Sequence, residues 1–261
     1  MVDWRIVCGF VLVTLLSLAV LYICLIRPWH LRWGATDVEV AETLPGDDLV
    51  QGSKGEATHA ITIRASAAEI WPWLIQLGQD RAGFYSYTWL ENLFGCHMKN
   101  TYQIVPEWQH LKVGDGVLFT PQFPRIPVAV LEPNRALVIG GTVNAKTGQP
   151  IQGGQVDLDT SLSTSWAFVL HEHGEHQTRL IARLRGRFPR GLLPWLVNRL
   201  FWEPAHFIME RRMLLTIKRL AEASRTSKTR LELDLLPQDQ PQVQLEVPRS
   251  ACDTPRMETN V

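Results

Sequence analysis

The sequence predicts an α+β protein in which a strand and two helices are followed by an antiparallel meander and a long C-terminal helix, with one transmembrane helix before them. Residues 203–225 lack Gly and have Pro only at Pro204, where it suits a first helical turn, and their apolar side chains recur on one helical face. Residues 101–188 contain short β-rich runs separated by turn residues. Residues 6–26 carry no charge and are long enough to cross a bilayer as a helix.

The composition is that of a globular protein. The 261 residues suffice for one domain with a sizeable core plus accessory segments. Lys plus Arg and Asp plus Glu number 26 each, so the overall charge favours no nucleic-acid partner. The four cysteines show neither a disulfide framework nor zinc-ligand spacing. Because Walker A, G-x-G-x-x-G and G-x-S-x-G motifs are also missing from the sequence, we expect no cofactor.

Residues 1–33 are predicted to be a membrane anchor. Trp4 lies at one end of the apolar run and Trp29 and Trp33 at the other, as in the aromatic belts of membrane helices. A cleaved signal peptide is the alternative, but the run is long for one and no A-x-A-like site follows it. We therefore expect a single-pass protein of the cell membrane, held through residues 6–26.

The charges that flank this run bear on its orientation. Arg27 and Arg32 follow the run, whereas Arg5 and the terminal amino group precede it. Cytoplasmic flanks carry the excess of Arg and Lys in membrane proteins. The slight excess after the run favours a globular domain in the cytoplasm.

Residues 34–57 are polar, acidic and rich in Gly, and this pattern predicts a linker between membrane and domain. The domain is expected over residues 58–224 and begins with a strand in HAITIRA, residues 59–65. Ser66 and Glu69 form a capping-box pattern that predicts a helix ending near Gly78.

The stretch DRAGFYSYTWLENLFG, residues 80–95, is a second helical candidate with a dense aromatic cluster. Beyond it, an antiparallel meander is predicted. Its runs are TYQIVPEW, VGDGVLF, PVAVLE, ALVIGG, TSWAFVLHE and TRLIARLRGRF. Residues 143–160 are rich in Gly, Gln and Asp and predict a long hairpin loop.

The last two strands alternate clearly between apolar and polar residues. One face is predicted to carry the apolar side chains Trp166, Phe168, Leu170, Leu180, Ala182, Leu184 and Phe188. The other face is predicted to carry a row of arginines exposed to water: Arg179, Arg183, Arg185 and Arg187. The C-terminal helix should cover the apolar face.

Two segments flank that helix. Residues 191–202, GLLPWLVNRLFW, are nearly free of charge and either pack on the sheet, the reading we favour, or lie in the membrane interface that holds the N-terminus. Residues 225–261 are dominated by Gln, Pro, Ser and charges and are predicted to be a disordered tail.

Three stretches resemble the SRPBCC superfamily of START-like and polyketide-cyclase-like proteins, and in particular its membrane-anchored bacterial members. They are ASAAEIWPWLIQLGQDRAGFYSYTWLENLFG, VPEWQHLKVGDGV and EPAHFIMERRMLLTIKRLAE. The resemblance covers residues 58–224 and implies a helix-grip fold, in which a curved antiparallel sheet wraps around the long C-terminal helix with an apolar cavity between them. The superfamily includes lipid and hormone binding, cyclisation and hydrolysis, so the fold does not decide the function.

The candidate ligand-binding residues are the aromatic, Met and polar side chains expected at that cavity. They are Phe84, Tyr85, Tyr87, Trp89, Trp166, Phe168, His206, Met209, Glu210 and Met213. His206 and Glu210 lie four residues apart and so project from one side of the helix. They would hold a polar ligand head or act as acid and base, but a purely structural ion pair is the more common use of such positions.

Two possible metal sites are supported less well than ligand binding at the cavity. Glu203 and His206 form an E-x-x-H pair without the complementary ligands that carboxylate metal sites require. His171, His173 and His176 cluster at a hairpin without Cys or Asp, which is more typical of a solvated turn. We expect no metal.

The function favoured by the sequence is binding of a hydrophobic small molecule or lipid, without catalysis. Two alternatives stay open: a cyclase- or hydrolase-like enzyme that uses His206 and Glu210 as acid and base, and an interaction protein whose cavity is filled by its own side chains. The cavity beside His206 distinguishes them, because it would be apolar and open, wet and open, or filled, respectively.

Overall fold

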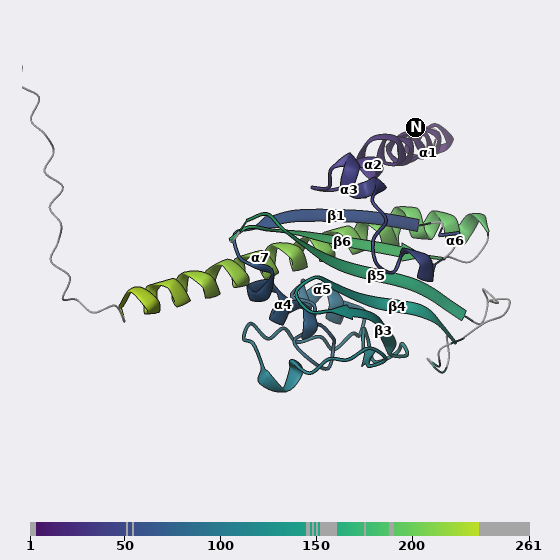
Figure 1. Cartoon of the computed structure of the whole chain (residues 1–261). Helices are drawn as coiled ribbons and strands as arrows, with labels where there is room; N and C mark the ends of the chain where they lie inside the picture. Colours follow the sequence, from purple (N-terminus) through teal and green to yellow (C-terminus); the bar gives the residue numbers. More distant parts are fainter. Residues whose placement is uncertain are drawn as a thin grey trace, which may run out of the picture.

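The computed structural model describes residues 4–234 apart from 51, 54, 145–146, 148, 150, 152–160, 175 and 188–190. Six strands form one antiparallel sheet in the order β1-β6-β5-β4-β3-β2. They are β1 (Gly55–Ile63), β2 (Gly116–Val117), β3 (Ile126–Glu132), β4 (Ala136–Asn144), β5 (Ser161–Glu172) and β6 (Thr178–Gly186). Figure 1 shows the twisted sheet with α7 crossing one face and the N-terminal segment on the other.

The helices lie on both sides of this sheet. The α-helices are α1 (Trp4–Leu21), α2 (Arg27–His30), α3 (Asp37–Ala41), α4 (Ala67–Ile75), α5 (Thr88–Leu93), α6 (Leu192–Val197) and α7 (Glu203–Asp234). Short 3-10 turns form η2 (Asp47–Leu49) and η3 (Pro106–Trp108), and π-helical turns form η1 (Tyr22–Ile26) and η4 (Asn198–Trp202). The strand, helices, meander and long final helix are the predicted order, so the α+β helix-grip architecture is confirmed.

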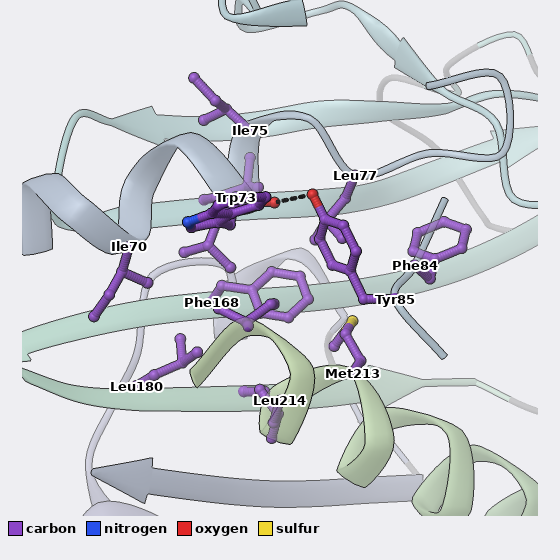
Figure 2. Close-up of a cluster of buried hydrophobic side chains, with 14 of the residues drawn as sticks. Ile70, Trp73, Ile75, Leu77, Phe84, Tyr85, Phe168, Leu180, Met213 and Leu214 are labelled. Carbon is purple, nitrogen blue, oxygen red and sulfur yellow. Dashed lines mark hydrogen bonds between the residues drawn. The ribbon is translucent and has the colours of Figure 1, made fainter. Parts of the chain in front are cut away.

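The core lies between the sheet and α7. The predicted strand parity is confirmed, since Trp166 pairs with Leu184 and Phe168 with Ala182 on the apolar face. Phe188 lies outside the described residues. Figure 2 shows Met213 and Leu214 of α7 beneath Phe168, with Trp73 of α4 on the other side. Burial of such side chains contributes about 1.5–3 kcal/mol each.

Two predicted elements differ from the structure. The capping box of Ser66 and Glu69 starts α4 as expected, but the second helix covers only α5. Its predicted first half is an irregular segment, because Tyr85 has a positive φ of 55° and its amide donates to Asn100 Oδ1 at 2.9 Å. The expected strand at residues 101–108 contains the 3-10 turn η3 instead.

Residues 34–50 are not a free linker but cover the outer face of the sheet. Thr36 and Glu39 form a capping box that starts α3. Arg183, predicted to face water, is buried and donates to Asp47 Oδ2 at 2.7 Å and to the Glu42 carbonyl at 2.7 Å. Arg179 pairs with Glu39 at 2.6 Å. The acidic segment therefore pairs with Arg179, Arg183 and Arg185, and the prediction that these arginines face water was wrong.

The N-terminal helix is long and apolar enough to cross a membrane over Trp4–His30, and its apolar window is unburied. The residues that follow this helix pair with the domain. The carbonyls of Leu31 and Trp33 accept from the amides of Thr58 and Ala60, which extends pairing beyond the edge strand β1. Gly34 follows with φ of 73°, where a Cβ would collide with the Ala60 carbonyl.

Each π-helical turn ends two residues before a proline, η1 before Pro28 and η4 before Pro204. A proline cannot donate to the carbonyl four residues earlier and its ring clashes with it. The wider π turn relieves that conflict without ending the helix. Residues 192–234 therefore form one continuous helical rod, and Pro204 lies inside it rather than at its start.

The end of α7 also differs from the prediction. The helix was expected to end at Arg225, but it continues nine residues further, to Asp234, within the predicted tail. The remaining residues of that tail, 235–261, lie outside the described part of the chain.

Candidate functional site

A cavity of about 360 Å³ lies between the sheet and α7. Most of its wall is aromatic, Met or aliphatic. The lining residues are Phe84, Ser86, Glu91, Cys96, Met98, Phe119, Thr120, Phe123, Ile126, Ile139, Thr164, Trp166, Leu184, His206, Met209, Glu210 and Met213. The cavity reaches the surface at Phe123, whose side chain is 57% exposed although it lines the wall.

Six of the ten candidate residues line this cavity. They are Phe84, Trp166, His206, Met209, Glu210 and Met213. They come from β5, from α7 and from the segment before α5, so the grip of the sheet on α7 brings them together.

The other four candidates lie elsewhere. Tyr85 is buried in the core, where its hydroxyl accepts from Gln76 Nε2 at 2.7 Å and donates to the Trp73 carbonyl at 3.3 Å (Figure 2). Phe168 packs against Trp166 at 4.8 Å, inside the core. Tyr87 lies beneath the guanidinium of Arg212. Trp89 is 70% exposed. Tyr85 and Phe168 therefore belong to the core, and Tyr87 and Trp89 do not line the cavity.

The carboxylate of Glu210 is fully buried at the cavity wall and already surrounded by N–H groups. Trp166 Nε1 donates to its Oε1 at 2.6 Å, and His59 Nδ1 contacts its Oε2. His206 Nε2 lies 3.2 Å from Oε2. Burial raises the pKa of this carboxyl, but His206 and His59 outweigh burial and hold the pKa below its usual range. Glu210 is therefore ionised, paired and poorly available as a general base.

The hydrogen bonds of His59 define its protonation. Nε2 lies 2.8 Å from the carbonyl oxygen of His30, which can only accept, so Nε2 carries a proton. Nδ1 contacts the carboxylate of Glu210, so both ring nitrogens of His59 face oxygen atoms. The buried pair of His59 and Glu210 thus links the end of the N-terminal helix, at His30, to the cavity wall.

His206 faces the cavity more freely. Its ring stacks on His59 at 6.3 Å and meets Trp166 edge-on at 5.9 Å. Although Nε2 approaches Glu210, it has no hydrogen bond of regular geometry with any described residue. His206 is the member of the predicted pair that remains available to a ligand.

Two further polar side chains at the wall have no hydrogen-bond partner among the described residues. Glu91 of α5 is 2% exposed, and both of its carboxyl oxygens are unpartnered. Burial raises its pKa to about 7. The hydroxyl of Ser86 is buried and unpartnered as well. Buried polar groups normally find a partner, so these groups suit a ligand rather than packing.

Sequence reasoning missed His59, Ser86 and Glu91. The signal for His59 was present, because it alternates with Ile61 and Ile63 on the core face of β1. Nothing in the local pattern around Glu91 separates it from an exposed helical Glu. Its burial follows from how the short α5 packs beside the cavity, which depends on the tertiary structure.

The metal readings find no support within the described ranges, where no group of three or more His, Cys, Asp or Glu side chains could hold an ion. Glu203 accepts two hydrogen bonds from Arg27, at 2.6 and 3.1 Å. His171 lies 3.9 Å from Glu42, and His173 and His176 are exposed.

No protein-family model matches the chain. No curated protein sequence matches it either. Several solved structures are similar in fold. Norcoclaurine synthase from Thalictrum flavum matches with 16% identity over 69% of this chain and 93% of that one, at a TM-score of 0.34. Aha1 from Colwellia psychrerythraea matches with 18% identity over 64% and 96%, at 0.34. A polyketide-cyclase-like protein from Corynebacterium glutamicum matches with 17% identity over 69% and 93%, at 0.28.

These neighbours belong to the SRPBCC superfamily, which the sequence motifs of this chain resemble. Similarity at this level of identity concerns the fold and leaves activity open. The chain is a helix-grip protein by its own topology, and its resemblance to the SRPBCC superfamily remains an interpretation of its sequence motifs.

Proposed function

We propose that this protein binds a hydrophobic small molecule or lipid in the cavity between the sheet and α7. The observation that carries the proposal is the cavity itself, about 360 Å³ with a mostly apolar wall and an opening at Phe123. Ligand pockets in proteins typically have volumes of roughly 300–1,000 Å³. Close-packed interiors leave few voids larger than a water molecule, so a cavity of this size is not ordinary packing.

The two alternative functions fit the site less well. An acid–base enzyme built on His206 and Glu210 needs a free carboxylate, but Trp166 and His59 already donate to that of Glu210. An interaction protein would fill the cavity with its own side chains, whereas Tyr85 and Phe168 pack in the core and leave the space beside His206 open. Binding is the reading that uses both the apolar wall and the polar groups on it.

The protein is further proposed to hold this cavity at a membrane surface. Arg27 follows the apolar part of the N-terminal helix and Glu203 follows the apolar segment α6–η4, and their bidentate ion pair fixes the ends of the two segments together. Trp29 also packs edge-on against Phe207 at 5.5 Å. A membrane crossed by α1 would therefore lie near α6 and η4.

The surface of α6 and η4 supports this position. Its exposed apolar side chains are Leu192, Leu193, Trp195, Val197, Leu200, Phe201 and Trp202. Such a surface suits the interfacial region of a bilayer. Phe201 contacts Phe94 at 6.0 Å, just beyond the α5 helix that carries Glu91, so this surface adjoins the cavity region. The interface reading of residues 191–202 thus fits better than packing on the sheet.

The cytoplasmic side is proposed on the flanking arginines alone. Labelling of the tail residue Cys252 by a membrane-impermeant thiol reagent tests it, in a variant without the other cysteines. Labelling in lysed but not in intact cells is expected, and labelling in intact cells would reverse the orientation.

Photolabelling tests the binding proposal. The full chain in nanodiscs is exposed to an uncharged diazirine-bearing dodecanol and irradiated, and the labelled peptides are mapped. We expect labels on peptides that contain Phe123 and Met213, which line the cavity. Met209→Trp should suppress these labels by filling the cavity, whereas Ile208→Trp, the same enlargement on an exposed side of α7, should not. Equal labelling in both variants would sink the proposal.

A further inference from the structure

We propose that the cavity selects an apolar ligand that carries a primary or secondary amine, and that the carboxyl of Glu91 is the group that recognises it. This inference rests on the binding function proposed above and adds the chemical class of the ligand.

The placement of Glu91 is the first observation. Its side chain comes from the short helix α5, is almost completely buried, and lines the cavity with both oxygens lacking a hydrogen bond to any residue that the structure describes. Burying a carboxyl without a partner costs several kcal/mol or forces it to take up a proton. A ligand with N–H donors would remove that cost.

Among the residues that the structure describes, no cation acts on this carboxyl. The cavity wall contains neither Lys nor Arg. Burial alone raises the pKa of Glu91 to about 7, with no charged neighbour among the described residues acting on it, and Glu91 adds to the effect of burial in raising the pKa of the half-buried Cys96 thiol. The carboxyl thus becomes ionised near neutral pH and has no counter-charge until a ligand brings one.

The contrast with Glu210 shows which carboxyl is available. Both glutamates line the same cavity, but the carboxylate of Glu210 already accepts a hydrogen bond from Trp166 Nε1 and pairs with His59. An arriving ammonium group would gain little at an already neutralised pair. At Glu91 it would form a new charge-assisted hydrogen bond, which is about twice as strong as a neutral one.

The unpartnered hydroxyl of Ser86 favours an amine over other head groups. A primary ammonium group has three N–H donors and a secondary one has two, so either can donate to Glu91 and keep a donor for the Ser86 oxygen, which lines the same cavity. An alcohol offers a single donor. A carboxylate or phosphate offers none and would be repelled by an ionised Glu91. Aromatic rings at the wall, among them Phe84 and Phe119 at 5.1 Å from each other, suit the apolar body of the ligand.

The test compares three probes that differ only in the head group: 4-phenylbutylamine, 4-phenylbutan-1-ol and 4-phenylbutanoic acid. Their heats of binding are measured on the full chain in phosphatidylcholine nanodiscs at pH 8, after subtraction of empty nanodiscs. We expect the amine to bind at least about tenfold more tightly than the alcohol, and the acid most weakly. Glu91→Gln should abolish the advantage of the amine and leave the alcohol within about twofold.

Matched variants keep the result interpretable. Glu107→Gln makes the same change at an exposed position and should preserve the advantage of the amine. If all three probes bind equally and Met209→Trp blocks them all, cavity binding stands and the amine inference fails. If Glu91→Gln retains the preference, or the acid binds as well as the amine, the inference is also overturned. If no probe binds, both proposals fail.

Discussion

At the scale of single residues, the buried pair of His59 and Glu210 connects three parts of the chain. His59 Nε2 donates to the His30 carbonyl at the end of the N-terminal helix, and the Glu210 carboxylate accepts from Trp166 in the sheet. Breaking a buried ion pair by removing one partner costs about 3–5 kcal/mol, because the other charge is left buried and unpaired. The pair therefore contributes to the fold more than to chemistry.

Glu210→Gln is expected to lower the free energy of unfolding of the full chain in mild detergent by about 3–5 kcal/mol, measured by urea titration. His206→Ala should cost less, because the His206 ring is partly exposed and lacks a regular hydrogen bond, but it should weaken ligand uptake. A similar loss in both variants, with ligand uptake unchanged in His206→Ala, would assign a structural role to His206 as well.

The raised pKa of Glu91 predicts that folding stability depends on pH in the opposite sense from the effect of Glu210. Its pKa rises from 4.5 to about 7 on folding, so the folded state binds the proton more tightly. Stability should be highest below about pH 4.5 as far as this group is concerned, and should fall as pH rises through about 7. The lowered pKa of Glu210 acts in the other sense, because its contribution is present above pH 4.5 and is lost as pH falls through the folded pKa.

Thermal unfolding of the ligand-free chain at pH 5 and pH 8 checks the Glu91 effect. The wild type should lose melting temperature between the two pH values, and Glu91→Gln should lose less, because it carries no titratable group at this position. Equal losses would show that Glu91 does not carry the dependence.

The residues of the site could be predicted where their position follows from periodicity. Met209, Met213, His206 and Glu210 share one helical face, and Trp166 follows from strand parity. Tyr87 and Trp89 do not line the cavity, because the helix that carries Trp89 is shorter than predicted. The positive φ of Tyr85 breaks that helix, and this conformation is set by contacts with Asn100 that no local pattern reveals.

At the scale of elements, α6 and η4 form the apolar first part of the rod that continues as α7. The π turns before Pro28 and Pro204 place Arg27 and Glu203, each the residue before a proline, in direct contact. Two apolar helices are thereby held at one point of the domain. The pairing depends on residues 176 positions apart, so sequence periodicity alone predicted the helices but not their junction.

A spin label measures whether α6 lies at the membrane. A nitroxide replaces Leu193 in a variant without native cysteines, reconstituted as the full chain in liposomes. Leu193 is 72% exposed, and Val113, at 62% exposed on a loop, gives the matched control. We expect the label at 193 to collide more with oxygen and less with a water-soluble nickel chelate than the label at 113. Indistinguishable collision rates at the two sites would place α6 in water.

At the scale of the whole molecule, the sheet is covered on both faces. Its inner face packs on α4 and α7, and its outer face carries the segment of residues 34–50. The fold class and strand order were predictable from periodicity and parity. The position of residues 34–50 on the outer face was not predictable, since these residues are polar and match a linker in composition. Its acidic side chains nevertheless complement the arginine row of β6, so charge pairing was the signal that identified it.

A chain of contacts also connects the N-terminal helix, the sheet and the cavity wall. The N-terminal helix ends against β1 and α7, its His30 carbonyl contacts His59, and His59 pairs with Glu210 at the cavity wall. We expect the cavity to keep its shape only when the contact between His59 and Glu210 is intact.

The central claim, that the cavity between sheet and α7 holds a hydrophobic ligand, is tested most directly by native mass spectrometry of the full chain purified from cells. The account predicts one bound small molecule per chain in the wild type and in Ile208→Trp, and its loss in Met209→Trp. A wild-type chain that carries no adduct, or an adduct that persists unchanged in Met209→Trp, would contradict the claim.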